Sequence, residues 1–169
     1  MNQNYNALIL KSVKITAGAI LAILFASFLN LKYSATAGII TILSIQNTKK
    51  ETIQTALARG EAFCCALLVS FLCYNFFGYT TAAFGIYLLI FTTLCLIMKW
   101  SSAIAMDSVL ITHFLAEKTT NIPMIANEIS LFLIGAGIGV LLNLSLRPKE
   151  NAWKDKMAEA DESIRAIIQ

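Results

Sequence analysis

The longest part of this sequence without a charged side chain runs from Ala62 to Met98, a stretch of 37 residues. The hydrocarbon core of a bilayer is about 30 Å thick, and a helix of about 20 apolar residues crosses it. The stretch is too long for one crossing helix and has the length of two. Its middle, Tyr74–Thr81, contains a glycine and several polar residues, and we expect the turn there.

The composition also indicates an integral membrane protein. Hydrophobic residues make up 57% of the chain before glycine is counted, and charged residues make up 14%. Soluble domains have about 45–50% apolar residues with glycine included and about 25% charged residues. The net charge of +3 is too small an excess to indicate a nucleic-acid partner. The lipid bilayer is the partner that this composition predicts.

Four further apolar runs bring the expected number of transmembrane helices to six, arranged as three hairpins. The second run is short, because about 16 uncharged residues between Lys32 and Lys49 make only about 24 Å of helix. We expect it to cross nevertheless, with both lysines reaching out to the headgroups. The prediction is an all-α transmembrane bundle over residues 1–148, in which the other helices are Ile15–Leu31, Tyr33–Gln46, Trp100–Ala116 and Ile129–Leu146, and a polar segment, Asn47–Glu61, follows the second.

The basic residues predict the orientation, since cytoplasmic helix ends carry an excess of Lys and Arg. With the N-terminus inside, only Lys32 and Lys118 fall in outer loops. This bias needs an even number of crossings, so both termini are predicted to be cytoplasmic. The basic residues then on the inside are Lys11, Lys14, Lys49, Lys50, Arg59, Lys99, Arg147 and Lys149.

After the last apolar run, residues 149–169 show a helical period with one apolar face. Trp153, Met157, Ala160 and Ile164 recur at helical spacing with charges between them. This predicts a cytoplasmic amphipathic helix. It either lies on the membrane or pairs in an oligomer, or it begins a cytoplasmic domain that is cut off here.

Asp107 is the candidate that carries most functional information, because it falls near the middle of the fifth apolar run. A carboxylate at that depth costs at least about 2.5–3.5 kcal/mol on insertion scales, so it should face the bundle interior or water. It is either a proton-coupling or substrate-path group, or an interhelical hydrogen-bonding residue. His113 lies about 120° around the same helix from Asp107. We expect it to pair with Glu117 at i+4, as a structural contact or a proton relay.

Small residues at helical spacing predict close helix packing in three of the spans. The sequence contains no nucleotide-binding loop, no nucleophile and base pair, and no grouping of metal ligands; its four cysteines lie in apolar runs and suit packing roles. We therefore expect neither an enzyme nor a cofactor or metal. The packing candidates are Gly18, Ala22 and Ala26 in the first span, Ser101, Ala105, Ser108 and Thr112 in the fifth, and Gly135, Gly139 and Asn143 in the sixth.

Two stretches resemble the membrane domain of the bacterial aromatic acid exporter family, which is related to the fusaric acid resistance proteins. The first is AGIITILSIQNTKKETIQTAL (Ala37–Leu57) and the second is HFLAEKTTNIPMIANEISLFLIGAGIGVLLNLSLRP (His113–Pro148). The second stretch holds the family's histidine (His113) and its Asn-Glu pair (Asn127 and Glu128). The resemblance covers roughly residues 8–150. It implies six spans, an inner-membrane location and a role in exporting aromatic carboxylates or related organic anions.

Two functions follow as hypotheses. The first is a proton-coupled secondary exporter of organic anions, working as a homo-oligomer. The anion would enter at the inner mouth, where uncharged polar groups precede a basic pair. The second is a non-transporting oligomeric module that anchors a cytoplasmic helical domain. The candidate substrate and coupling residues are Asp107, His113, Ser44, Gln46, Asn47, Lys49, Lys50 and Arg59.

Overall fold

The structure, a computed structural model, describes residues 2–45 and 49–145. The candidates Gln46 and Asn47, the basic residues after Ser145 and the amphipathic helix over 149–169 lie outside the described residues. The described residues form six α-helices and no strand, so the all-α prediction is confirmed for them. The helices are α1 (Asn2–Phe28), α2 (Ala35–Ser44), α3 (Lys49–Phe77), α4 (Thr81–Ile97), α5 (Ile104–Glu117) and α6 (Ile122–Ser145).

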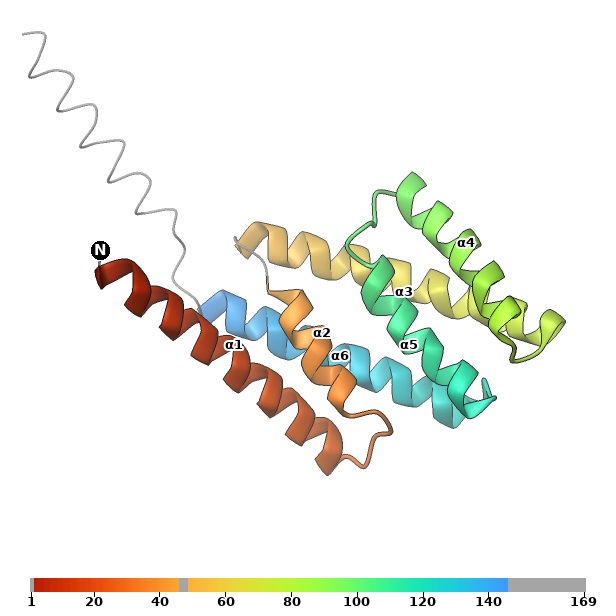
Figure 1. Ribbon diagram of the computed structural model, residues 1–169, viewed down its shortest axis with the longest axis horizontal. Helices are drawn as coiled ribbons and strands as arrows, with labels where there is room; N and C mark the ends of the chain where they lie inside the picture. The colour runs from red at the N-terminus through yellow and green to blue at the C-terminus, as the bar shows by residue number, and fades with distance from the viewer. Residues whose placement is uncertain (1, 46–48, 146–169) are drawn as a thin grey trace, which may run out of the picture.

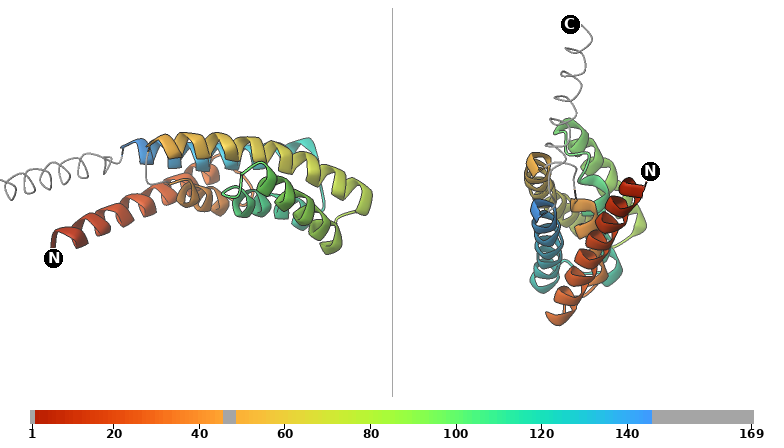
Figure 2. Two further views of the ribbon diagram at one scale, coloured as in Figure 1. Left: turned by 90° about the horizontal axis from the view of Figure 1, so that it is seen from above. Right: turned by 90° about the vertical axis from the view of Figure 1, so that its left-hand side faces the viewer.

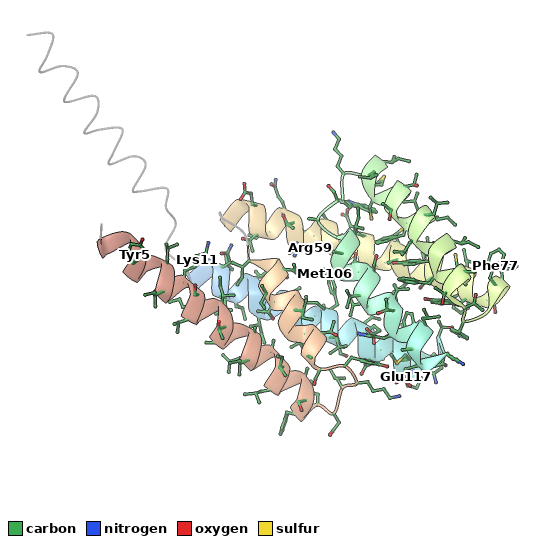
Figure 3. All side chains as sticks on the ribbon, in the orientation of Figure 1. Tyr5, Lys11, Arg59, Phe77, Met106 and Glu117 are labelled. Carbon is green, nitrogen blue, oxygen red and sulfur yellow. The ribbon has the colours of Figure 1, made fainter. Side chains whose placement is uncertain are left out.

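Consecutive helices run in opposite directions (Figure 1). One end of the bundle therefore holds the beginnings of α1, α3 and α5, and it carries Lys11, Arg59 and Lys99. We call it the basic end. The other end holds the α1–α2 and α5–α6 connections with Lys32 and Glu117, and we call it the Glu117 end. Figure 3 labels Arg59 and Glu117 at these two ends.

The short helix α2 lies at the centre of the bundle and contacts α1, α3, α5 and α6. Figure 2 shows α3 and α6 in one layer, with α1, α2 and α5 against them. The buried apolar residues form two clusters. One lies between α3, α4 and α5 around Tyr74, Tyr87 and Phe91. The other joins α1, α2 and α6 around Ala22, Ala26 and Ile40.

The contact between α2 and α6 is close because α6 presents glycines to α2. A Cβ on Gly135 would lie 2.6 Å from the Ala37 carbonyl oxygen, and one on Gly139 would lie 3.0 Å from the Thr41 carbonyl oxygen. The Thr41 hydroxyl also donates to the Gly135 carbonyl across this contact (3.0 Å). The backbones thus approach within a distance that only glycine permits. Gly18 of α1 faces the Leu142 side chain of α6, not its backbone.

Large apolar side chains cover much of the outer surface. A soluble protein exposes few contiguous apolar patches, whereas lipid-facing helices expose them all round. Three helices are long and apolar enough to cross a bilayer, within α1 (Lys11–Phe28), α3 (Glu51–Phe77) and α6 (Ile122–Leu144); α2 and α4 are apolar but shorter. Exposed residues on this surface include Leu24, Phe28, Leu68, Phe76, Leu89 and Leu133.

The hairpin of α3 and α4 lies where the sequence predicts it, with one difference. The turn falls inside Tyr74–Thr81: α3 ends at Phe77, Gly78 has a φ of +70°, and the Thr80 hydroxyl caps α4 by accepting from the Ala83 amide (3.1 Å). The difference lies before the hairpin. The polar segment from Lys49 to Glu61 continues into the apolar helix, so that α3 is one helix of 29 residues. The segment contains no proline, and its Lys, Glu, Gln, Ala, Leu and Arg residues favour a helix.

Three helices begin or end at other residues than the hydropathy indicates. The second span, expected from Tyr33 to Gln46, has a helix of only 10 residues, α2, which is about 15 Å long. The fifth begins at Ile104 instead of Trp100, because residues 98–103 form turns and Lys99 has a φ of +61°. The sixth begins seven residues before Ile129, at Ile122, where the Asn121 side chain caps it by accepting from the Met124 amide (3.0 Å).

Candidate functional site

Asp107 lies in the first turn of α5 and is fully buried. The sequence placed it at mid-span; it is nearer the basic end because α5 starts four residues later than expected. Arg59 of α3 is also buried (5% exposed), and its charge acts on that of Asp107. A basic and an acidic side chain are thus enclosed between α3 and α5.

Unsatisfied polar atoms gather around this pair. Within the described residues, five buried side-chain atoms have no hydrogen-bond partner: both Asp107 carboxylate oxygens, Arg59 Nε, Tyr87 Oη and Ser108 Oγ. Asp107 interacts electrostatically with Arg59 and with Tyr87, and the Tyr87 and Ser108 hydroxyls are neighbours. Buried polar groups in native proteins are nearly always paired, so each exception needs an explanation. These five atoms belong to four residues, Arg59, Tyr87, Asp107 and Ser108, that interact with one another.

Arg59 also fastens the end of α2. Its Nη1 donates to the Leu43 carbonyl oxygen (2.8 Å) and lies 3.5 Å from the Ser44 hydroxyl oxygen. The Ser44 hydroxyl donates in turn to the Ile40 carbonyl (2.7 Å). A guanidinium carries five N–H donors, so these two contacts leave others to meet a carboxylate. Arg59 therefore holds the end of α2 with only part of its hydrogen-bonding capacity.

Aromatic side chains of α4 line the site on its other side. Tyr87 is fully buried and lies between Phe84 and Phe91, with ring centroids 5.6 and 5.4 Å away. These rings belong to the buried cluster between α3, α4 and α5. The site thus combines one buried cation, one buried acid, two hydroxyls and an aromatic wall.

The remaining candidates of the inner mouth lie near this end of the bundle. Lys49 and Lys50 form the first turn of α3. Asn143, near the end of α6, is buried and donates from Nδ2 to the Thr52 hydroxyl of α3. It therefore ties α6 to the polar first part of α3. Ala22 and Ala26 are completely buried in the core and reach none of these groups.

His113 belongs to a second polar cluster, at the Glu117 end. Its Nδ1 lies 2.7 Å from the Glu128 carboxylate of α6, and its Nε2 lies 3.4 Å from the Thr36 hydroxyl of α2. The ring of Tyr33 stacks on the imidazole at 4.0 Å. The prediction that His113 pairs with Glu117 is therefore wrong. Glu117 turns instead to the α1–α2 connection, where it accepts from Lys32 Nζ (2.6 Å) and the Tyr33 hydroxyl (3.1 Å).

Glu128 and its neighbour Asn127 are the site residues that the hydropathy analysis missed. Glu128 is fully buried and Asn127 is 8% exposed, yet both precede the apolar run that begins at Ile129. Both residues were recognised as the Asn-Glu pair of the family pattern, but no function was predicted for them. Asn121 followed by Pro123 was the available signal, because an Asn cap and an early proline mark a helix start. Moving the start to Ile122 places both residues inside the bundle.

These features define a class: a helical integral membrane protein with an apolar outer surface and a buried charged site between its helices. Within that class, the model of aromatic acid exporter family member 1 matches residues 7–146, and the chain belongs to this family. An uncharacterized Bacillus subtilis protein, YqjA, is 36% identical over 162 residues, which are 94% of this chain and 50% of that protein. The chain spans about half the length of this relative. No solved structure matches.

Proposed function

We propose that this chain forms the membrane part of a secondary exporter that moves aromatic carboxylates or related organic anions out of a bacterial cell, coupled to protons through Asp107. The observation that supports it most is the gathering of unpartnered buried polar atoms around Asp107 and Arg59. The membership in the aromatic acid exporter family supports the proposed outward direction and substrate class. The proposed setting is the cytoplasmic membrane, with six crossings and both termini inside.

In the proposed mechanism Arg59 receives the carboxylate of the anion. The basic residues at this end, Lys49 and Lys50 among them, raise the local concentration of anions. The aromatic ring then lies against the Tyr87 and Phe91 column. Arg59 can then exchange one negative partner, the Asp107 carboxylate, for another, the carboxylate of the anion.

The sign of the proton coupling follows from the two charges. An ionised Asp107 neutralises Arg59, whereas a protonated Asp107 leaves the Arg59 charge to be neutralised by the incoming anion. Anion binding and protonation of Asp107 therefore favour each other. The anion then crosses together with a proton, in an electroneutral step. Net export follows when the cytoplasmic acid is concentrated enough to outweigh the opposing proton gradient.

Counterflow of labelled benzoate and a panel of larger aromatic acids in proteoliposomes tests this proposal. The expected result is flux into preloaded vesicles, with proton movement in step with the anion and little dependence on an imposed membrane potential. Asp107→Asn should abolish the proton movement and the pH dependence of flux. Glu61→Gln, an exposed acid on α3 near the same end, is the matched control and should transport normally. No flux across the whole panel would count against the proposal.

A second candidate function is an oligomeric membrane anchor for a cytoplasmic domain. The fully hydrogen-bonded cluster of His113, Glu128 and Asn127 favours it, because such a network can simply hold helices together. The two functions differ in the Asp107 site, which an anchor does not need. For either one we propose a homo-oligomer, formed through part of the exposed apolar surface.

A further inference from the structure

The six helices form two groups of three, and the candidate anion site lies at the boundary between the groups. Helices α1, α2 and α6 contact mostly one another, and so do α3, α4 and α5. Arg59 belongs to the second group and binds the end of α2, in the first group, across the boundary. The close glycine contacts, at Gly18, Gly38, Gly135 and Gly139, all lie within the first group. The helices are thus held more closely within the groups than between them, which makes the boundary the natural course of a path through the bundle.

Phe63 of α3 and Phe132 of α6 stack on each other across this boundary. Their ring centroids are 4.8 Å apart, and the two rings are parallel within 1°. Both side chains are buried, with exposed fractions of 4% and 7%. Met106, the neighbour of Asp107 in the sequence, and Leu110 belong to the same buried cluster. The stack is therefore an apolar contact between the two groups of helices, beside the charged site.

The stack lies between two polar layers. On α3, Phe63 follows Arg59 by four residues, and on α6, Phe132 follows Glu128 by four residues. Residues four apart lie on the same side of a helix and about 6 Å apart along its axis. Since α3 begins at the basic end and α6 at the Glu117 end, Arg59 lies on one side of the stack and Glu128 on the other. A solute that moves along the boundary from Arg59 towards Glu128 has to pass the two rings.

We propose that the Phe63–Phe132 stack is the barrier in the transport path, and that an aromatic ring opens it by taking the place of one phenylalanine. The second half of this inference rests on the proposed transport function, whereas the barrier can be measured without an aromatic substrate. An apolar constriction excludes water and ions because it offers no polar group to replace their hydration. The closed stack therefore keeps the polar layers on its two sides apart.

The position of the stack relative to Arg59 explains why an aromatic ring would open it. The spacing of about 6 Å along α3 is similar to the length of a benzoate ion, so the ring of an acid held by Arg59 comes within reach of Phe63 as it leaves the Tyr87 and Phe91 column. A flat aromatic ring makes the same offset stacking contacts that the two phenylalanines make with each other. A saturated ring of the same size lacks these contacts. The stack should therefore favour aromatic over saturated acids.

Chloride leak from proteoliposomes tests the barrier without an aromatic substrate. The vesicles hold a chloride-quenched dye, and a potassium diffusion potential that is positive inside drives chloride inward. Vesicles with the unmodified protein should be as tight as protein-free vesicles. Replacing both rings, with Phe63→Ala and Phe132→Ala together, should raise the leak by about tenfold or more, because water and ions then enter the constriction. Phe132→Ala alone takes the place of the double variant if the latter does not fold.

Phe114→Ala is the matched control for the leak. Phe114 is as deeply buried, at 1% exposed, but it lies in the cluster between α3, α4 and α5 and not between the two groups of helices. Its replacement should lower the melting temperature and leave the vesicles tight. A rapid leak through the unmodified protein, or ring variants that are as tight as the unmodified protein, would overturn the barrier.

Counterflow of labelled benzoate and cyclohexanecarboxylate tests the opening by an aromatic ring, after subtraction of the flux through protein-free vesicles. The unmodified protein should move benzoate severalfold faster. Phe63→Leu and Phe132→Leu keep an apolar side chain but lose the ring, so each should bring the ratio of the two rates close to unity, whereas Phe114→Leu should keep it. An unchanged ratio in both ring variants would overturn the selection by the stack. Absence of counterflow in the unmodified protein, together with a leak in the ring variants, would contradict the transport function and leave the barrier in place.

Discussion

Arg59 donates from Nη1 to the Leu43 carbonyl oxygen at 2.8 Å, and so joins the first part of α3 to the last turn of α2. A helix end leaves carbonyl groups without intrahelical partners, and a buried guanidinium satisfies one of them here. The same guanidinium faces the charge of Asp107. A structural contact and a candidate anion site therefore share one side chain.

Replacing Arg59 separates these two roles. Arg59→Gln removes the charge and the hydrogen bond from Nη1 to the Leu43 carbonyl oxygen, and should destabilise the bundle by about 1.5–3 kcal/mol, the range for hydrogen bonds to charged groups. Arg59→Lys keeps the charge but loses the planar donors, so it should fold better than Arg59→Gln and still bind the anion weakly. Thermal melting in detergent and counterflow measure the two effects. Lys99→Gln, an exposed cation at the same end, is the control and should alter neither.

The contact between α2 and α6 predicts opposite effects at two neighbouring glycines. An added Cβ at Gly135 would meet backbone and side-chain atoms at 2.6 Å, whereas one at Gly137 has nothing within 4 Å. Gly135→Ala should lower the free energy of unfolding by about 1–3 kcal/mol through overpacking. Gly137→Ala should raise it by about 0.5–1 kcal/mol, since alanine favours the helix. Equal melting temperatures for the two variants would contradict the close contact.

Two buried tyrosines offer a test of the unpartnered atoms. Tyr74 donates its hydroxyl to the Ile111 carbonyl (3.4 Å), whereas the Tyr87 hydroxyl has no hydrogen-bond partner among the described residues. Tyr74→Phe should cost about 0.5–1.5 kcal/mol of stability. Tyr87→Phe should leave stability unchanged or raise it, and should change the counterflow of hydroxylated aromatic acids. A stability loss at Tyr87 as large as that at Tyr74 would show that its hydroxyl is paired after all.

The surface pair of Lys32 and Glu117 predicts a pH dependence at the Glu117 end. The hydrogen bond from Lys32 holds the pKa of Glu117 below its usual value of 4.5, with a second contribution from Tyr33. The pair's stabilisation is thus fully present above about pH 4.5 and is lost as the pH falls through the lower, folded pKa. The same hydrogen bond raises the pKa of Lys32 above 10.5, so the contribution is also lost at strongly alkaline pH.

The measurement is the difference in melting temperature between the unmodified protein and Glu117→Gln. It should be small, because the pair is exposed, and smaller still at high salt. Below the folded pKa of Glu117 the two proteins should melt alike. A difference that persists undiminished at acid pH would mean that Glu117 acts through something other than its charge.

The local sequence was sufficient for the helical class and the family. The uncharged stretch Ala62–Met98 predicted two helices with a turn before Thr81, and α3 and α4 meet there. Hydropathy and charge are local properties of the chain, so they can be read without knowing which helices are neighbours. The family motifs could be recognised for the same reason. Hydropathy and the family motifs did not reveal where α5 and α6 begin. The turn at Lys99 precedes α5, and the Asn121 cap sets the first residue of α6.

Only the tertiary structure decided which polar groups meet. Helical spacing favoured Glu117 as the partner of His113, but Glu117 lies at the surface and binds Lys32, while α6 brings Glu128 into the dry interior. A carboxylate attracts an imidazole more strongly where water is excluded than at the surface, where the attraction is screened. Likewise Asp107 was conspicuous in the sequence, but its electrostatic interaction with Arg59 depends on how α3 and α5 pack. The sequence indicated that Asp107 must be buried, whereas the packing of the helices determined that Arg59 and Glu128 are buried as well and what each of them faces.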